Sequence, residues 1–138
     1  MRFLADSNVL SEPTKPHPDG GVLDWLRQNE RSLAVSPIIL GEMEYGILLL
    51  PAGVKRRKLE EWFAAGRERL SVLDFDKASA TAWAELLARL KASGRSMPIK
   101  DSLIAATALA HDLTVATRNI SDFQHAGVRL VNPFEHAN

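Results

Sequence analysis

Carboxylate and amide side chains recur beside the short apolar runs of this sequence, where they could build one acidic site. Asp6 directly follows the apolar run 3–5, and Asn119 comes shortly after the run 114–117. Asp101 stands just before an alanine-rich apolar stretch. Carboxylates that gather at one place repel one another, and some stay protonated, unless a cation neutralises them. Mg²⁺ and Mn²⁺ prefer such oxygen ligands and support phosphodiester hydrolysis by orienting the phosphate and activating a water molecule.

The residues alone leave the membership of this site open. Glu42 and Glu44 lie in the same helical stretch, and hydrophobic periodicity does not choose between them. Asp101 could instead be an N-cap, which satisfies the free amides and the dipole of the following helix. Asn119 suits an ordinary loop with an Asx turn, and Asp122 suits the start of a helix. The set of acids, and no single acid, therefore carries the inference.

Apolar runs that alternate with helical stretches supply the elements that would bring these side chains together. Short, continuously apolar strands separated by helices are typical of a parallel sheet covered on both faces, so we expect an α/β fold. In such a sheet, ligands bind outside the carboxyl ends of the strands, where several of these polar residues lie. The predicted strands are 3–5, 33–35, 72–73, 114–117 and 128–131. The predicted helices are 37–50, 54–69, 77–92 and 102–110, and the proline- and glycine-rich stretch 13–21 is a predicted loop.

The composition limits the class of protein. A length of 138 residues predicts a single domain over 1–138 that buries its own core. Seventeen basic and 17 acidic residues give a net charge of zero, which argues against a protein that wraps a long nucleic acid by charge alone. Cysteine is absent, which excludes a disulfide framework and a zinc-cysteine site. The acid at position 6 argues against a signal peptide and no apolar run could span a bilayer, so we expect a soluble, cytoplasmic protein without a membrane partner.

Four groups of motifs follow one another along the chain. They are Leu4-Ala5-Asp6-Ser7-Asn8-Val9-Leu10-Ser11-Glu12; Ser36-Pro37 through Gly41-Glu42 to Gly46; Lys100-Asp101-Ser102-Leu103-Ile104-Ala105-Ala106-Thr107-Ala108; and Val115-Ala116-Thr117-Arg118-Asn119 with Asp122-Phe123 and Asn132-Pro133-Phe134. Each motif is weak alone, but together they cover the chain end to end. In this order they resemble the PIN-domain ribonucleases, and within them the FitB-like branch of the VapC-type toxins of type II toxin–antitoxin systems.

The resemblance implies a PIN fold, a Rossmann-like α/β/α sandwich with a central, mainly parallel sheet of about five strands. It implies an endoribonuclease that cleaves RNA phosphodiester bonds at an acidic pocket by a water molecule activated by Mg²⁺ or Mn²⁺. It selects Glu42 over Glu44 and makes Asp6, Glu42 and Asp101 the metal-binding acids. The other implied site residues are Asn8, which orients Asp6 or a metal-bound water; Thr117, which lines the pocket; Asn119, which replaces a fourth acid; and Asp122, which can compensate for it. Because the Asn119 amide carries no charge, we expect weaker retention of a second metal ion.

The resemblance also implies partner molecules. A small antitoxin of the VapB/FitA type would wrap the toxin with its C-terminal segment, block the acidic pocket and bind operator DNA through its N-terminal domain. A homodimer is implied, to which the helices 37–50 and 54–69 contribute apolar side chains beyond the need of one helix face. The candidate contacts to RNA phosphates are Arg95, Lys100 and Arg118, because they lie close in sequence to Asp101 or Asn119.

Two other classes of protein are alternatives. One is a non-catalytic interaction module with the PIN fold, which the uncharged Asn119 favours and the three acids disfavour. The other is a Rossmann-like phosphotransfer protein with an acidic site, such as a receiver domain with Asp74 as phosphoacceptor. That hypothesis lacks an adjacent acidic pair after the first strand, and the chain has Asp6-Ser7-Asn8 where a phosphatase of this class has Asp-x-Asp.

Overall fold

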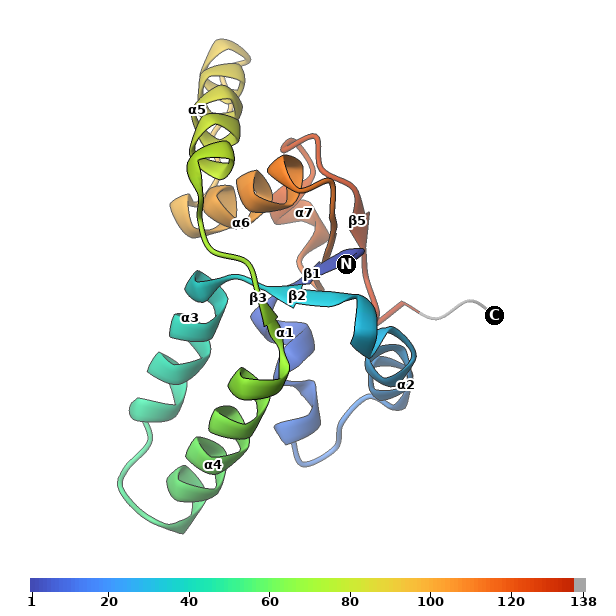
Figure 1. Ribbon diagram of the computed structural model, residues 1–138, viewed down its shortest axis with the longest axis vertical. Helices are drawn as coiled ribbons and strands as arrows, with labels where there is room; N and C mark the ends of the chain where they lie inside the picture. The colour runs from blue at the N-terminus through green and yellow to red at the C-terminus, as the bar shows by residue number, and fades with distance from the viewer. Residues whose placement is uncertain (136–138) are drawn as a thin grey trace.

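The apolar runs form a five-stranded parallel sheet in the computed structural model, which describes residues 1–135 (Figure 1). The strands are β1 (Phe3–Ala5), β2 (Leu33–Val35), β3 (Ser71–Val72), β4 (Thr114–Ala116) and β5 (Leu130–Val131), in the spatial order β3-β2-β1-β4-β5. All neighbouring pairs are parallel. Every residue of β1 and β2 is buried, as expected for strands that are covered on both faces. The predicted α/β fold is confirmed.

The register of β1 with its two neighbours brings three chain segments to one edge of the sheet. Phe3 pairs with Leu33 of β2 and with Thr114 of β4, so the three strands start level and run in the same direction. The backbone amide of Asp6 donates to the carbonyl oxygen of Ala116 at 2.9 Å, which continues the pairing one residue beyond β1. The segments that follow β1, β2 and β4 therefore meet at the carboxyl edge.

Seven α-helices and two 3-10 turns connect the strands within the described residues. In the view of Figure 1, α3 and α4 extend downward from the sheet and α5 rises above it. The helices are α1 (Ser7–Leu10), α2 (Gly20–Asn29), α3 (Pro37–Leu48), α4 (Val54–Arg69), α5 (Lys77–Ala92), α6 (Ile99–Ala110) and α7 (Ile120–Phe123), and the 3-10 turns are Glu12–Thr14 and Glu30–Ser32.

The core is organised around α6, which contacts β1, β4 and α5. Ile104, Ala105 and Ala108 of this helix are fully buried, as the predicted apolar character of the stretch requires. The indole nitrogen of Trp83 in α5 donates to Ser102 Oγ at 2.9 Å, so this buried hydroxyl is paired. A helix that is packed on so many sides holds the acid in its first turn at a fixed position.

The predicted start of α6 was wrong. The helix begins at Ile99, three residues before the predicted start at Ser102, and Pro98 occupies the N-cap position that Asp101 was considered for. Asp101 instead lies inside the first helical turn. The continuous apolar pattern starts only after Lys100 and Asp101, so it predicted the buried part of the helix and missed the first turn. The observed limits of three strands also differ from the predicted ones by one or two residues; these strands are 71–72, 114–116 and 130–131.

The helix α2 was not predicted, because the adjoining prolines and glycines indicated only a loop. Asp19 starts it: its Oδ1 accepts the backbone amide of Val22 at 3.1 Å, which satisfies a free amide of the first turn. The preceding loop is anchored by the buried Glu12, whose Oε2 accepts the amide of Asp19 at 2.8 Å and whose Oε1 lies 3.1 Å from Lys15 Nζ. The hydrogen bond from the Asp19 amide lowers the pKa of Glu12 below its ordinary value. The predicted loop is thus ordered and shorter than expected.

The hairpin of α3 and α4 leaves apolar side chains at the surface. Tyr45, Leu48 and Leu49 near the end of α3, and Val54 at the start of α4, are all at least half exposed. These helices are the ones expected to contribute to a homodimer. No helix within residues 1–135 is long and apolar enough to cross a membrane.

Candidate active site

Asp6 occupies the turn between β1 and α1 and is held there by three donors. It is the N-cap of α1, with Oδ1 accepting the amide of Ser7 at 2.8 Å. Oδ2 accepts the hydroxyl of Thr117 at 2.7 Å and the side-chain amide of Asn8 at 3.3 Å. Only 5% of Asp6 is exposed. These hydrogen bonds hold the Asp6 carboxyl group in one orientation directly at the carboxyl end of the central strand.

Asn8 and Thr117 tie the segment after β1 to the segment after β4. The Asn8 amide also donates to Thr117 Oγ1 at 3.4 Å, and Asn8 Oδ1 accepts the backbone amide of Arg118 at 3.0 Å. Thr117 Oγ1 in turn accepts the backbone amide of Asn119 at 3.0 Å. The fully buried Thr117 hydroxyl therefore donates and accepts at once, which an apolar residue of the same shape could not do. The structure brings these predicted supporting residues together around Asp6.

Glu42 reaches the same edge from α3, which Ser36 and Pro37 start directly after β2. Its Oε1 accepts the Ser7 hydroxyl at 3.1 Å and lies 2.8 Å from Lys100 Nζ. Its Oε2 is buried and has no hydrogen-bond partner among the described residues. Glu44 is exposed, so the structure distinguishes the two glutamates that periodicity could not.

Asp101 approaches from α6 and is 8% exposed. Burial raises the pKa of its carboxyl above the ordinary value, and the neighbouring Asp6 carboxylate raises it further, while Lys100 opposes the shift. Asp122 and Glu42 contribute smaller increases to the same pKa. Within residues 1–135, no hydrogen bond reaches the Asp101 side chain. The acids of three different segments thus lie close enough to act on one another electrostatically.

The remaining predicted residues have different surroundings. Asn119 precedes α7 and is exposed, and Asp122 lies in the first turn of that helix, as its sequence position suggested. The guanidinium of Arg118 lies over the Phe134 ring, 4.7 Å from its centroid. Arg95 contacts the ring of His125. Lys100 reaches into the acidic site, but toward Glu42, an ion pair that sequence spacing did not predict.

These side chains suit a hard divalent cation. Glu42 Oε2 and the Asp101 carboxylate are oxygen donors without a protein partner in the described part of the chain, and Mg²⁺ and Mn²⁺ prefer such oxygens. No three His, Asp or Glu side chains of residues 1–135 are already gathered around one metal position. Glu42 Oε1 is paired with Lys100, and Asp6 accepts from Ser7 and Thr117, so these oxygens already have protein partners, while Glu42 Oε2 and Asp101 have none among the described residues.

The sequence matches a family model described as the PIN domain over residues 3–128. The chain belongs to the PIN domain family. It is similar to a protein named VapC ribonuclease Y4jK from Sinorhizobium fredii, with 39% identity over 98% of this chain and 99% of that protein. It is similar to Toxin FitB from Neisseria gonorrhoeae, with 36% identity over 96% of this chain and 98% of the toxin. A crystal structure of FitAcB from the same organism superposes with a TM-score of 0.90 at 34% identity, covering 97% of this chain and 99% of that one.

Membership in the PIN domain family confirms the predicted fold and the predicted resemblance. It removes the receiver-domain alternative. Asp76, one of the two acids after β3, is the N-cap of α5 and accepts the amide of Ser79 at 2.8 Å.

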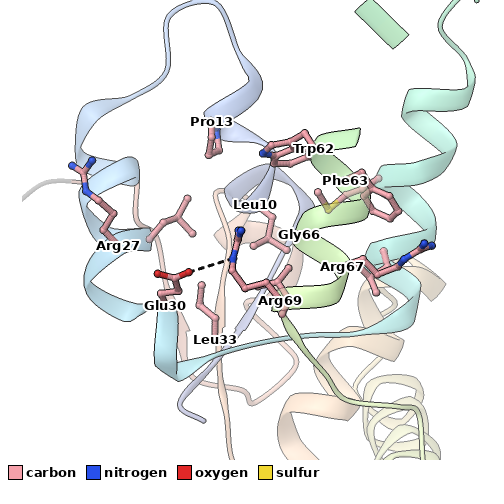
Figure 2. A pocket seen from close by; sticks show the side chains of 14 residues that line it. Leu10, Pro13, Arg27, Glu30, Leu33, Trp62, Phe63, Gly66, Arg67 and Arg69 are labelled. Atoms are coloured by element: carbon pink, nitrogen blue, oxygen red, sulfur yellow. Dashed lines mark ion pairs between the residues drawn. The ribbon is translucent and has the colours of Figure 1, made fainter. Parts of the chain in front are cut away.

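A separate apolar pocket of about 260 Å³ lies between α2, α3 and α4 of this PIN domain (Figure 2). Its walls carry Leu26, Leu40, Met43, Trp62 and Phe63, and its surroundings carry Arg27, Arg67, Arg69 and Glu30. Arg69 Nε lies 3.3 Å from Glu30 Oε1, the ion pair drawn in Figure 2. The surplus apolar side chains of α4 were expected to contribute to a homodimer. The pocket was not predicted, because α2, which forms one of its walls, was not predicted.

Proposed function

We propose that this PIN domain is a metal-dependent endoribonuclease of the VapC type and the toxin of a toxin–antitoxin pair. The observation that carries the proposal is the convergence of Asp6, Glu42 and Asp101 from three separate elements at one edge of the sheet. The ribonuclease named Y4jK and the toxin named FitB, which match over almost the whole chain, support it. The domain comprises 1–138 in this proposal, of which 136–138 lie outside the described residues.

Asp6, Glu42 and Asp101 would hold Mg²⁺ or Mn²⁺ through carboxylate oxygens. When bound, the ion orients the scissile phosphate and activates a water molecule. Asn8 and Thr117 keep Asp6 in one orientation, since each donates to the same carboxylate oxygen. Partners of this kind fix the ligands of metal sites and increase their affinity.

Asn119 stands at the fourth position of the site, where its neutral amide leaves three acids to balance the charge of the metal. Asp122, one helical turn away, adds negative charge near Asp101. Around this site, Arg118 and Lys100 would contact the RNA phosphates, with Arg95 as a further candidate. The backbone amide of Arg118 donates to Asn8 Oδ1, which holds this residue next to Asp6, and its guanidinium lies over the Phe134 ring.

Metal removal tests the proposed activity. Purified protein, freed of antitoxin, should cut end-labelled total RNA at discrete sites with Mg²⁺ or Mn²⁺. With EDTA the cutting rate should fall at least about 100-fold, because several kcal/mol of charge stabilisation is lost. Gel analysis and sequencing of the new ends would identify the RNA. Cutting that persists in EDTA, or no cutting with either metal, would contradict the proposal.

The apolar pocket is the docking place that we propose for the antitoxin. An antitoxin of the VapB/FitA type would insert an apolar side chain between α2, α3 and α4, and its C-terminal segment would continue to the acidic site. Partner segments commonly place apolar anchor side chains into hydrophobic grooves of this kind. The homodimer through α3 and α4, and a higher assembly of the toxin–antitoxin pair on operator DNA, are part of the same proposal.

Filling the pocket should separate antitoxin binding from catalysis. Gly66 lines the pocket, and a Cβ at this position would meet no atom within 4 Å. Gly66→Phe should therefore fold, since replacing glycine by phenylalanine inside a helix favours the helix by about 0.5 kcal/mol. We expect RNA cleavage within twofold of wild type and at least tenfold weaker binding of the co-purified antitoxin by calorimetry. Ala65→Phe, at the exposed neighbouring position, is the control; an equal loss there, or none in Gly66→Phe, would exclude this docking place.

A further inference from the structure

Lys100 carries a positive charge into the acidic site from the first turn of α6. Its Nζ lies 2.8 Å from Glu42 Oε1, the oxygen that also accepts the Ser7 hydroxyl. Both side chains of the pair are only partly buried, with 46% of Lys100 and 32% of Glu42 exposed. The contact is therefore open to water and to ions from solution.

The ion pair with Lys100 occupies a carboxylate oxygen of Glu42 that could otherwise be a metal ligand. Glu42 Oε1 already contacts the Ser7 hydroxyl and the Lys100 ammonium, which use both of its lone-pair positions, so a cation can bind this oxygen only if one of these donors leaves. The other oxygen, Glu42 Oε2, is buried and has no hydrogen-bond partner within residues 1–135, so it offers a ligand position beside the lysine. A divalent ion there would stand close to the ammonium, and like charges at such a distance repel strongly.

We propose that Lys100 is a resident counter-cation, which a divalent ion displaces from Glu42 and which then binds a phosphate of the RNA. The inference rests on the proposed function of the same site. The four-carbon stem of lysine permits the movement, because the ammonium is a point charge that can turn to a new anion without a fixed geometry. Lysine would thus keep the acids neutralised before metal binding and supply a positive charge to the substrate afterwards.

Calorimetry with Mn²⁺ tests the displacement without RNA. Lys100→Met keeps the length and helix preference of the side chain and removes its charge. We expect Mn²⁺ to bind about fivefold more tightly to this variant, since no ammonium has to leave Glu42. In EDTA the variant should melt below wild type, and Mn²⁺ should raise its melting temperature by more than it raises that of wild type. Lys91→Met, an exposed lysine near the end of α5, is the matched control and should bind Mn²⁺ as wild type does.

Cleavage kinetics test the second part of the proposal, the contact between Lys100 and an RNA phosphate. Lys100→Met should raise KM for RNA about fivefold or more at saturating Mn²⁺, with a smaller change in kcat, and Lys100→Arg should restore the wild-type KM. A Mn²⁺ affinity of Lys100→Met within twofold of wild type, or weaker, would overturn the displacement, and an unchanged KM would overturn the phosphate contact. Wild-type protein that still cuts RNA in either case would leave the proposed nuclease standing, so the two failures are distinguishable.

Discussion

Asp101→Asn should abolish RNA cleavage, with a loss of at least about 1000-fold in kcat/KM, and should raise the melting temperature of the metal-free protein. Activity falls because a neutral amide is a poor ligand for Mg²⁺ and several kcal/mol of charge stabilisation disappear. Stability rises because burial and the nearby Asp6 make the charged form of Asp101 unfavourable, which is the cause of its raised pKa. The isosteric amide keeps the shape and removes the charge.

The sign of the stability effect depends on pH. A carboxyl whose pKa is higher in the folded than in the unfolded protein destabilises the folded state as pH rises above the unfolded value, near 4. The gain of Asp101→Asn should therefore be present at pH 7 and vanish at acid pH, where Asp101 of wild type is protonated in both states. Thermal melts in EDTA across this range would measure it, at about 3 °C for each kcal/mol.

Asp24→Asn is the matched control, because Asp24 is an exposed acid on α2 that pairs with Arg27. It should change neither cleavage nor the melting temperature appreciably. Cleavage by Asp101→Asn within tenfold of wild type, or a melting temperature below that of wild type at pH 7 in EDTA, would show that Asp101 is not a buried member of the acidic site.

Glu42→Gln and Glu44→Gln should differ by about 100-fold or more in RNA cleavage, although the two positions are two residues apart on one helix. Glu42 contacts Ser7 and Lys100 at the carboxyl edge of the sheet, whereas Glu44 is exposed. We expect Glu42→Gln to lose the activity and Mn²⁺ binding together, because the metal loses a charged ligand. Glu44→Gln should keep both within twofold.

Parallel measurements of cleavage and Mn²⁺ calorimetry on the two purified variants would decide this. Far-UV circular dichroism would confirm that both keep the helix α3. Equal activities would contradict the assignment of Glu42, and a loss confined to Glu44→Gln would transfer the role to the other glutamate.

Hydrophobic pattern predicted β1 and β2 well because these central strands are fully buried and therefore read as continuous apolar runs. The same pattern predicted α3 and α5, whose N-termini are capped by Ser36 and Asp76. It failed where polar residues enter a buried helix, as at the start of α6. It also failed where proline and glycine stand beside a helix, as they do before α2. Because α2 was not predicted, the apolar pocket that it borders was not predicted either.

The sequence by itself determined the fold class, the family motifs and the position of Asp6 after the central strand, since these depend on local pattern and short spacing. Periodicity left Glu42 and Glu44 open and the family motifs selected Glu42, but only the tertiary structure brings Glu42 to Ser7, which lies 35 residues away in the chain. The tertiary structure also decided the direction of Lys100 and the burial of Asp101. Those properties depend on charges and desolvation from segments that are distant in the chain, and no local pattern records them.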